Sequence, residues 1–363
     1  MPKLNSSAES LAYQAEALPG VSRTFALTIP QLPEPLCHVV GNAYLLCRIA
    51  DTIEDEPALP VDEKSVYLDR FVSVVNGRSS AREFGRDLHP MLSDATIEAE
   101  RNLVANVDTV VGITRGFRRS QRQLIERCIG IMAPGMAEFQ ATMTPRGLEG
   151  MRDLDRYCYC VAGVVGETLT ELFCDYSPGL KSRRERLLGL SVSFGQGLQM
   201  VNILKDFWED RERGVCWLPR DVFADVGLDL SSLVPGKGQA GSKFALAMLR
   251  LIYVAAGHLA GAFRYTMLIP AKEAGMRRFL LWALGMAVQT LLRLAENPAF
   301  VNGAQVKISR NEVRAIVLAT SALVRWDRGL RWMFDRAVER ISRAGGGRSP
   351  QRGSARGLPL ARR

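Results

Sequence analysis

The sequence predicts an all-α protein whose helices form a single bundle around one core. Apolar residues recur with the helical period along most of the 363 residues. No convincing run of alternating apolar and polar residues, which is the pattern of a half-buried strand, is present. Apolar residues make up 47% of the chain and charged residues 23%, a composition that supports a sizeable core.

Pro and Gly residues divide the chain into nine expected helices, because neither residue continues a helix well. The helices cover roughly residues 35–56, 61–76, 94–113, 117–141, 151–174, 182–212, 241–265, 276–296 and 310–342. Beyond residue 342 the chain is rich in Gly, Arg and Pro and cannot build a core. The predicted organisation is therefore one domain, residues 1–342, followed by a disordered basic tail, residues 343–363.

Charge and cysteine content argue against several functional classes. The formal net charge is +9, but the tail alone holds six Arg and no acidic residue. The body is therefore not strongly basic, and a nucleic-acid partner is not expected. Seven Cys without paired C-x-x-C spacing and three scattered His argue against a disulfide framework and a zinc site. No feature points to an obligate protein partner.

The expected location is the cytoplasm, with peripheral contact at the inner face of the membrane left open. The N-terminus MPKLNSSAES lacks the apolar stretch of a signal peptide. The longest apolar run, residues 279–292, is short and interrupted for a membrane span.

The first candidate site lies at the end of the expected helix 35–56, in the stretch CRIADTIEDEPALP. Tyr44, Arg48, Asp51 and Asp55 are spaced 4, 3 and 4, so they form one polar stripe on a helix with an apolar opposite face. Two carboxylates at i and i+4 repel each other, at a cost of roughly 0.3 kcal/mol. A solvated surface pair is the alternative interpretation of this helix taken alone.

A second stripe of the same kind favours a shared site. In QMVNILKDFWEDRERGVCWLP, Gln199, Asn202, Asp206 and Asp210 are spaced 3, 4 and 4 between apolar flanks. Two facing stripes would bring four carboxylates to one cavity, which requires cations. Oxygen ligands favour Mg²⁺, which proteins commonly hold together with substrate phosphates. Basic residues that suit a diphosphate lie between the acids: Arg48, Lys205, Arg211 and Arg213.

A third segment, YCYCVAGVVGETLTELF, would supply a wall of the site. Tyr157, Val161, Val165 and Leu169 recur every four residues, with glycines between them that permit a close helix approach. Plain core packing accounts for this pattern equally well. Beside a diphosphate site, the same residues would line a hydrocarbon pocket and present one hydroxyl group, that of Tyr157.

Together these segments resemble the squalene/phytoene synthase family, the head-to-head prenyl transferases. The resemblance rests on SRTFALTI, YLLCRIADTIED, YCYCVAGVVGE, QMVNILKDFWEDRERGVCWLP and GAQVKIS, which occur in the family's order between residues 22 and 309. It implies an isoprenoid synthase-type helical bundle with a central cavity, in agreement with the helix pattern. It also implies head-to-head condensation of two farnesyl diphosphates through presqualene diphosphate to squalene, with NADPH-dependent reduction.

The resemblance assigns roles to individual residues. Tyr157 matches the family's catalytic tyrosine, implicated in proton removal during the first half-reaction. Six residues would hold Mg²⁺ against the diphosphates: Asp51, Glu54, Asp55, Asn202, Asp206 and Asp210. The four aspartates among them are also counted as catalytic. Positions that would bind the substrates are Ser22, Arg23, Phe25, Tyr44, Arg48, Val161, Val165, Gln199 and Asn202. Residues that would bind NADPH are Arg23, Arg48, Lys205 and Lys307.

The chain departs from squalene synthases around the expected NADPH site. Lys205 stands where many have Arg, Ser309 stands where a second basic residue is usual, and Val215 takes the place of a common Arg. No G-x-G-x-x-G is present, so NADPH would bind outside a Rossmann module. The C-terminal anchor of eukaryotic members is also missing, which implies a bacterial, soluble or peripheral form.

Three alternatives stay open. Within the family, the product would be dehydrosqualene, phytoene or presqualene diphosphate. A non-catalytic assembly or scaffold relative would be expected to lose the acidic residues that this chain keeps. The basic tail suggests a lipid-surface element or, less commonly, an RNA-binding one.

Overall fold

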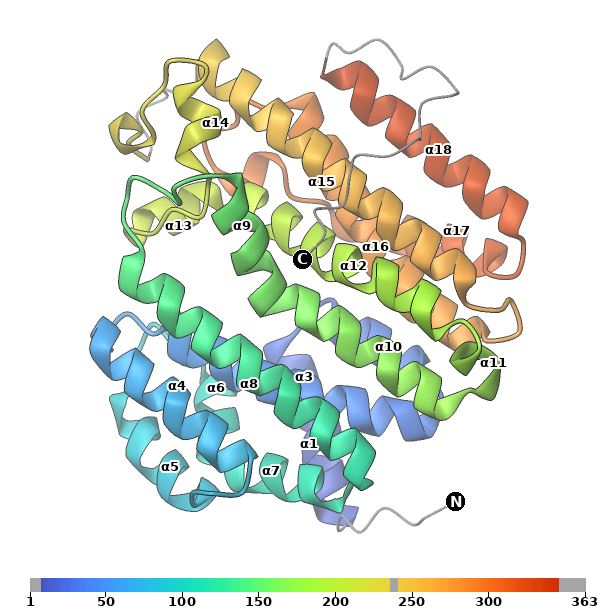
Figure 1. The fold of residues 1–363 in the computed structure, drawn as a ribbon. Coiled ribbons are helices and arrows are strands. Elements are labelled where there is room, and N and C mark those ends of the chain that lie inside the picture. Colours follow the sequence, from blue (N-terminus) through green and yellow to red (C-terminus); the bar gives the residue numbers. More distant parts are fainter. Residues whose placement is uncertain (1–7, 236–240, 346–363) are drawn as a thin grey trace.

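The computed structural model describes residues 8–235 and 241–345, and within these ranges it contains helices and no strand (Figure 1). The prediction of an all-α fold is confirmed. The predicted tail begins inside the last described helix, and its residues 346–363 lie outside the described residues.

The bundle is built from long helices joined by short ones. The long helices are α1 (Ala8–Val21), α3 (Glu34–Asp55), α4 (Val61–Val75), α8 (Arg119–Thr142), α10 (Val164–Tyr176), α12 (Arg184–Lys205), α15 (Ser242–Leu268), α16 (Ala274–Glu296), α17 (Arg310–Leu323) and α18 (Asp327–Ala344). The short helices are α2 (Phe25–Thr28), α5 (Ala81–Leu88), α6 (Glu98–Ala105), α7 (Val107–Gly116), α9 (Met151–Cys158), α11 (Pro178–Lys181), α13 (Phe207–Glu212) and α14 (Arg220–Ala224). A π-helical turn, Tyr159–Gly163, joins α9 to α10.

Three expected helices are interrupted, and five of the described α-helices were not predicted. The helices are interrupted at Asn106 between α6 and α7, at Asp206 between α12 and α13, and at 324–326 between α17 and α18. At Asp206 the backbone leaves helical geometry, although its N–H still donates to the carbonyl oxygen of Asn202 at 2.8 Å. The unpredicted helices are α1, α2, α5, α11 and α14. Helix α5 is capped by Ser80, whose hydroxyl accepts a hydrogen bond from the backbone N–H of Glu83.

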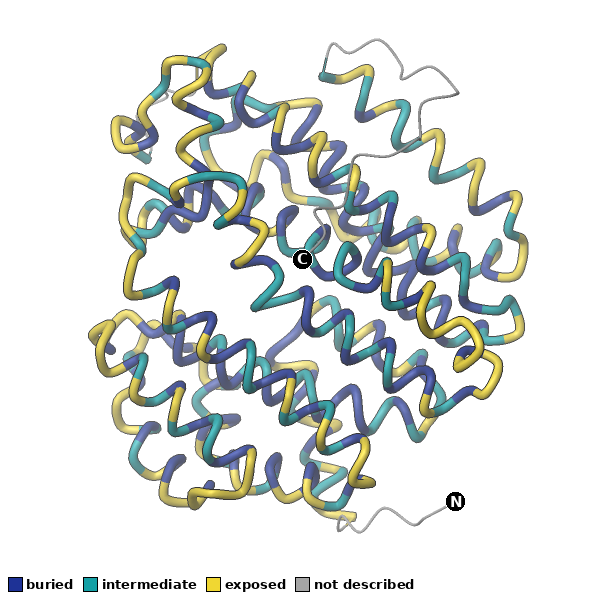
Figure 2. Tube along the Cα trace, viewed as in Figure 1, coloured by how far each residue is buried: buried dark blue, intermediate teal, exposed yellow. Residues whose placement is uncertain are grey.

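Helices α3, α8, α10, α12 and α16 form an inner layer. On one side α4 packs on α8, and on the other α15 packs on α12 while α18 packs on α16 (Figure 1). Figure 2 shows buried residues concentrated along the inner helices. The approach of α10 to α12 is so close that a Cβ atom at Gly166 would overlap the carbonyl oxygen of Ser191.

Three described helices, α12, α15 and α16, are long and apolar enough, by length and composition only, to cross a membrane. The most apolar windows of these helices are 56%, 44% and 78% buried inside the protein, respectively. Their apolar character therefore also serves the core, because each helix packs against neighbours on more than one side.

Candidate active site

A cavity of about 530 Å³ lies between the inner helices, and its two ends differ in polarity. The polar end is formed where α3 ends and where α12 meets α13, by Asp51, Glu54, Asp55, Asp206 and Asp210. The apolar end lies between the first half of α16, the second half of α10 and the middle of α12; its lining includes Leu172, Phe194, Phe279 and Ala283. The two acidic patterns therefore share one cavity.

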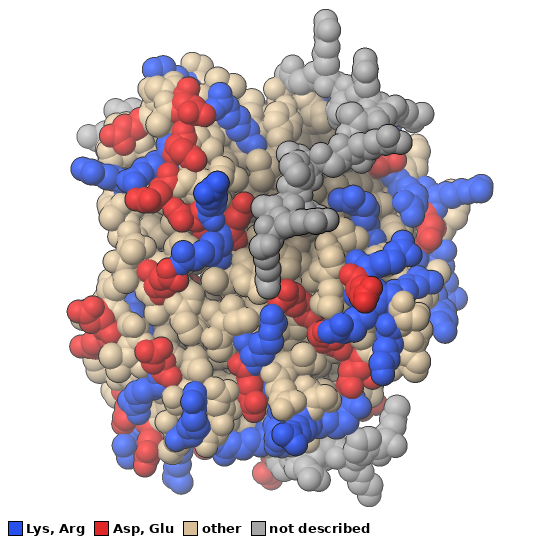
Figure 3. Space-filling model, in the orientation of Figure 1, with Lys and Arg blue, Asp and Glu red and all other residues tan. Residues whose placement is uncertain are grey.

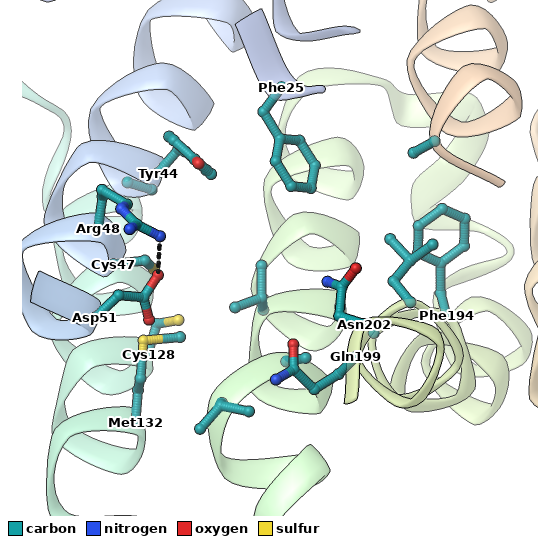
Figure 4. Close-up of a pocket in the computed structure, with 18 of the residues that line it drawn as sticks. Phe25, Tyr44, Cys47, Arg48, Asp51, Cys128, Met132, Phe194, Gln199 and Asn202 are labelled. Carbon is teal, nitrogen blue, oxygen red and sulfur yellow. Dashed lines mark ion pairs between the residues drawn. The ribbon is translucent and has the colours of Figure 1, made fainter. Parts of the chain in front are cut away.

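Most of the predicted site residues line this cavity. They are Phe25, Tyr44, Arg48, Asp51, Glu54, Asp55, Tyr157, Val161, Val165, Gln199, Asn202, Asp206 and Asp210. Figure 4 shows Tyr44, Arg48 and Asp51 on one wall, across the cavity from Gln199 and Asn202.

Four predicted residues do not line the cavity. Ser22 is buried, and its hydroxyl accepts a hydrogen bond from the N–H of Phe25 at 2.9 Å, which helps to hold the Phe25 ring 5.0 Å from that of Tyr44. Lys205 forms an ion pair with its neighbour Asp206. Arg23 and Lys307 are exposed, so of the four residues predicted for NADPH only Arg48 lines the cavity.

Arg213 joins the two acidic patterns. Its guanidinium group lies 3.2 Å from a carboxylate oxygen of Asp55 and 2.5 Å from one of Asp210. These two acids come from different helices, so this contact demonstrates directly that the patterns face each other. The arginine is half-exposed and could turn toward a bound anion.

Arg48 is held by a residue that the sequence patterns did not indicate. Glu100 of α6 accepts hydrogen bonds from Arg48 at 2.5 and 3.0 Å, and Asp51 lies 3.5 Å from the same guanidinium group. Burial acts to lower the pKa of Arg48, but Asp51 and Glu100 outweigh it and raise that pKa. No spacing rule links residues 48 and 100, so no sequence signal could have found this pair.

Tyr157 is positioned by contacts on three sides. Its ring stacks on that of Trp217, with centroids 3.8 Å apart, and meets Phe139 edge-on at 5.3 Å. Its hydroxyl donates a hydrogen bond to the carboxylate of Glu54 at 3.3 Å. Burial raises the pKa of Tyr157 well above its usual value, and the charge of Glu54 adds to that rise, so the hydroxyl stays protonated. Trp217, within the sequence GVCWLP, was also missed.

Three carboxyl groups of the polar end have raised pKa values. Burial raises the pKa of Asp51 to about 7, with a further contribution from Asp55. Burial raises the pKa of Glu54 to about 8, and Asp55 and Asp51 again add to it. Burial raises the pKa of Asp210 to about 6, although Arg213 opposes the change. A bound cation would relieve this repulsion.

The donor set fits Mg²⁺ as a partner of diphosphate. Every candidate ligand is an oxygen atom, and Mg²⁺ is typically bound by one or two carboxylates together with phosphate oxygens and water. Within residues 8–235 and 241–345, no group of three or more His, Cys, Asp or Glu is arranged to hold a metal ion by itself. The candidate ligands are therefore the aspartates of the two patterns, together with the oxygens that a substrate would bring.

Arg211 has a structural role instead of one in the cavity. Its guanidinium group donates to the backbone carbonyl oxygens of Pro145 and Leu233. It therefore secures the loops around α13, while Arg213, two residues later, reaches the acids.

The chain is similar to known proteins in both sequence and fold. Residues 18–312 match the family model described as squalene/phytoene synthase. Squalene synthase ERG9 of Candida albicans is 27% identical, over 85% of this chain and 67% of its own length. Squalene synthase clz20 of Cochliobolus lunatus is 28% identical, over 82% and 68%.

Solved structures agree on the fold. The complex of TcSQS with the ligand BPH1237 superposes with a TM-score of 0.71 at 23% identity, covering 95% of this chain and 93% of that one. A dehydrosqualene synthase superposes with a TM-score of 0.57 at 19% identity, covering 90% and 97%. Since the family match spans most of the chain and includes both walls of the cavity, this protein belongs to the squalene/phytoene synthase family and is a prenyltransferase.

Proposed function

We propose that this enzyme joins two molecules of farnesyl diphosphate head-to-head, through presqualene diphosphate, and releases squalene. The observation that carries the proposal is the single cavity with paired acidic patterns at one end and apolar walls at the other. Such a cavity suits a substrate with a diphosphate head and a hydrocarbon tail. The names of the relatives support squalene as the product.

Condensation begins at the polar end. Mg²⁺ bound there would neutralise diphosphate charge, while Arg48 and Arg213 offer guanidinium groups for its oxygens. The allylic C–O bond breaks and its electron pair leaves with the diphosphate. The resulting cation alkylates the C2–C3 double bond of the second molecule, and loss of one proton closes the cyclopropane ring. Phe25 and Tyr44 line this region with π faces that stabilise cationic charge, and the apolar walls exclude water.

Tyr157 and Glu54 are the proposed route for the lost proton. The tyrosine oxygen accepts the proton as its own hydrogen passes along the 3.3 Å hydrogen bond to Glu54. Burial raises the pKa of Glu54 to about 8 in the metal-free protein, and Mg²⁺ bound at the neighbouring aspartates would lower it, which would leave Glu54 ionised and able to receive the proton.

The reductive half of the reaction has less structural support. Of Arg23, Arg48, Lys205 and Lys307, only Arg48 lines the cavity, so we derive no hydride-transfer step from these residues. NADPH use and a cytoplasmic location stay part of the proposal.

Product analysis tests the proposal. Purified protein is incubated with farnesyl diphosphate and Mg²⁺, with and without NADPH, and the lipid products are identified. We expect presqualene diphosphate without NADPH and squalene with it. Dehydrosqualene would assign the chain to another branch of the family. Failure to consume farnesyl diphosphate under all conditions would support a non-catalytic scaffold instead.

A further inference from the structure

The apolar end of the cavity points toward one end of the bundle. There α10 and α15 end, α12 and α16 begin, and α17 turns into α18 (Figure 1). Hydrogen bonds hold these ends together: Arg183 donates to the carbonyl oxygen of Leu268 at 2.6 Å, and Arg277 donates to that of Val324 at 3.0 Å. We define this region, residues 181–186, 272–278 and 325–331, as the basic end.

The basic end carries much of the positive charge of the described chain. It holds ten basic residues and three acidic ones, and Figure 3 shows Lys and Arg gathered along the right-hand edge where these helix ends lie. The basic residues are Lys181, Arg183, Arg184, Arg186, Lys272, Arg277, Arg278, Arg325, Arg328 and Arg331, and the acidic residues are Glu185, Glu273 and Asp327. Asp327 is moreover neutralised by the buried Arg277, at 2.6 Å. This end therefore presents a strongly positive surface.

Large apolar side chains protrude beside this charge. Among the described residues, the three most exposed large hydrophobic side chains are Leu318, Trp332 and Trp326, at 71%, 66% and 59%. The other three tryptophans of the chain are at most 8% exposed. All three protruding side chains lie within two turns of the junction between α17 and α18.

The protruding side chains form one surface with unpaired arginines. Leu318 is exposed on the last two turns of α17, Trp326 directly precedes α18, and the Trp326 ring lies against Gly329, one turn before Trp332. Arg325, Arg328 and Arg331 are exposed, and none of them forms an ion pair within the described part of the chain. Tryptophan beside unpaired arginine is the combination typical of proteins at a membrane–water interface.

We propose that the basic end docks on an anionic lipid bilayer, with Trp326, Trp332 and Leu318 inserted at the headgroup level. The charge is complementary to anionic headgroups, and the apolar side chains favour a bilayer over a nucleic acid. Docking places the apolar end of the cavity nearest the lipid and the acidic end toward water. The benefit to a hydrocarbon product rests on the proposed function, whereas the docking itself does not.

Vesicle flotation of the full-length protein tests the docking. Wild-type protein should float with phosphatidylcholine vesicles that contain phosphatidylglycerol and not with pure phosphatidylcholine. Each arginine near an anionic surface changes partitioning roughly fivefold, so R325Q/R328Q/R331Q should weaken it on the order of 100-fold. W326S/W332S should weaken it by about tenfold and abolish the change in tryptophan fluorescence that insertion produces.

Matched control variants separate this surface from general charge and apolarity. R78Q/R82Q/R152Q removes three exposed arginines elsewhere, and V66S/I97S removes two exposed apolar side chains, Val66 and Ile97, that are 58% and 53% exposed. Both controls should float like the wild type, and all variants retain the basic tail. Unchanged flotation of both docking variants, or equal loss in the controls, would overturn the proposal.

Further outcomes separate lipid docking from self-association and from RNA binding. A dimer that W326S/W332S dissociates, or RNA binding that replaces vesicle binding, would also contradict a lipid partner. Consumption of farnesyl diphosphate, measured in solution without vesicles, should be equal in all variants. If the wild type fails only that assay, the proposed function fails and the docking result stands.

Discussion

The chain carries the same five-residue pattern, Asp-x-x-Glu-Asp, twice, and the fold gives the two copies different surroundings. Asp51 to Asp55 closes the continuous helix α3, whereas Asp206 to Asp210 spans the break before α13. Glu54 is buried and accepts a hydrogen bond from Tyr157. Its counterpart Glu209 is exposed, and its oxygens lie beside Gly303. The comparison teaches that a shared motif sets the chemistry available, while neighbouring helices decide which residue performs it.

The largest expected effect comes from removing one aspartate of either pattern. Asp51→Asn or Asp206→Asn should lower turnover of farnesyl diphosphate on the order of a hundredfold or more, because each change removes charge that balances Mg²⁺ and diphosphate. Turnover is measured at limiting Mg²⁺, with circular dichroism to establish that each variant is folded. Near-normal turnover in either variant would contradict the metal-site assignment for that pattern.

Tyr157→Phe tests the tyrosine that only the first pattern contacts. Formation of presqualene diphosphate should slow by roughly a hundredfold, since a positioned acid–base group is lost while the ring keeps its stacking on Trp217. Rapid-quench measurement of that step is the readout, and the melting temperature serves as control. An unchanged rate would remove Tyr157 from the catalytic residues.

The two glutamates offer the sharpest test of the comparison. Glu54→Gln should slow the same step by roughly tenfold or more, because the amide can no longer take up the proton from Tyr157. Glu209→Gln, at the equivalent position of the second pattern, should stay within about twofold of the wild type, because this side chain is exposed. Equal effects of the two substitutions would show that the patterns are interchangeable.

The free energy of unfolding should also distinguish the acidic pattern at 51–55 from that at 206–210 in the metal-free protein. The pKa of Asp51 is raised from 3.8 to about 7, so ionising it costs the folded state more than the unfolded chain. The free energy of unfolding therefore falls as the pH rises from 3.8 to about 7. After allowance for solvent screening, Asp51→Asn should raise the free energy of unfolding by about 1 kcal/mol near pH 8 and by almost nothing near pH 4.

Urea unfolding at the two pH values measures this gain. Asp206→Asn is the matched control and should bring no gain, because Asp206 is more exposed and already pairs with Lys205. Mg²⁺ with diphosphate should reverse the order by stabilising the wild type more than Asp51→Asn. If Asp51→Asn is less stable than the wild type near pH 8 without metal, the ionised Asp51 does not destabilise the metal-free protein and the prediction is wrong.

The smallest expected effect concerns the link between the patterns. Arg213→Gln breaks the contacts with Asp55 and Asp210, but the side chain is half-exposed, so the free energy of unfolding should change by less than about 1 kcal/mol. The KM for farnesyl diphosphate should rise by roughly tenfold, since a diphosphate-binding cation is lost. Arg211→Gln is the comparison, and it should lower stability more than it alters KM.

Much of the fold could be predicted because the apolar residues of each helix recur with the helical period in the sequence. The prediction of a helix at 35–56 matches α3, and that at 276–296 overlaps all but the first two residues of α16. Breaks inside helical patterns were missed, since Asp206 keeps its hydrogen bond to Asn202 and the apolar spacing continues past it. Helix α5 was missed because it buries a few residues over only two turns.

The sequence by itself determined the helical class and the two polar stripes, all of whose residues line the cavity. These follow from local spacing, which one helix expresses without its neighbours. Only the tertiary structure decided that Arg213 joins Asp55 to Asp210, that Glu100 holds Arg48, and that the basic residues gather at one end of the bundle. Such contacts join positions far apart along the chain, so they depend on which helix faces pack together, and no local period encodes that choice.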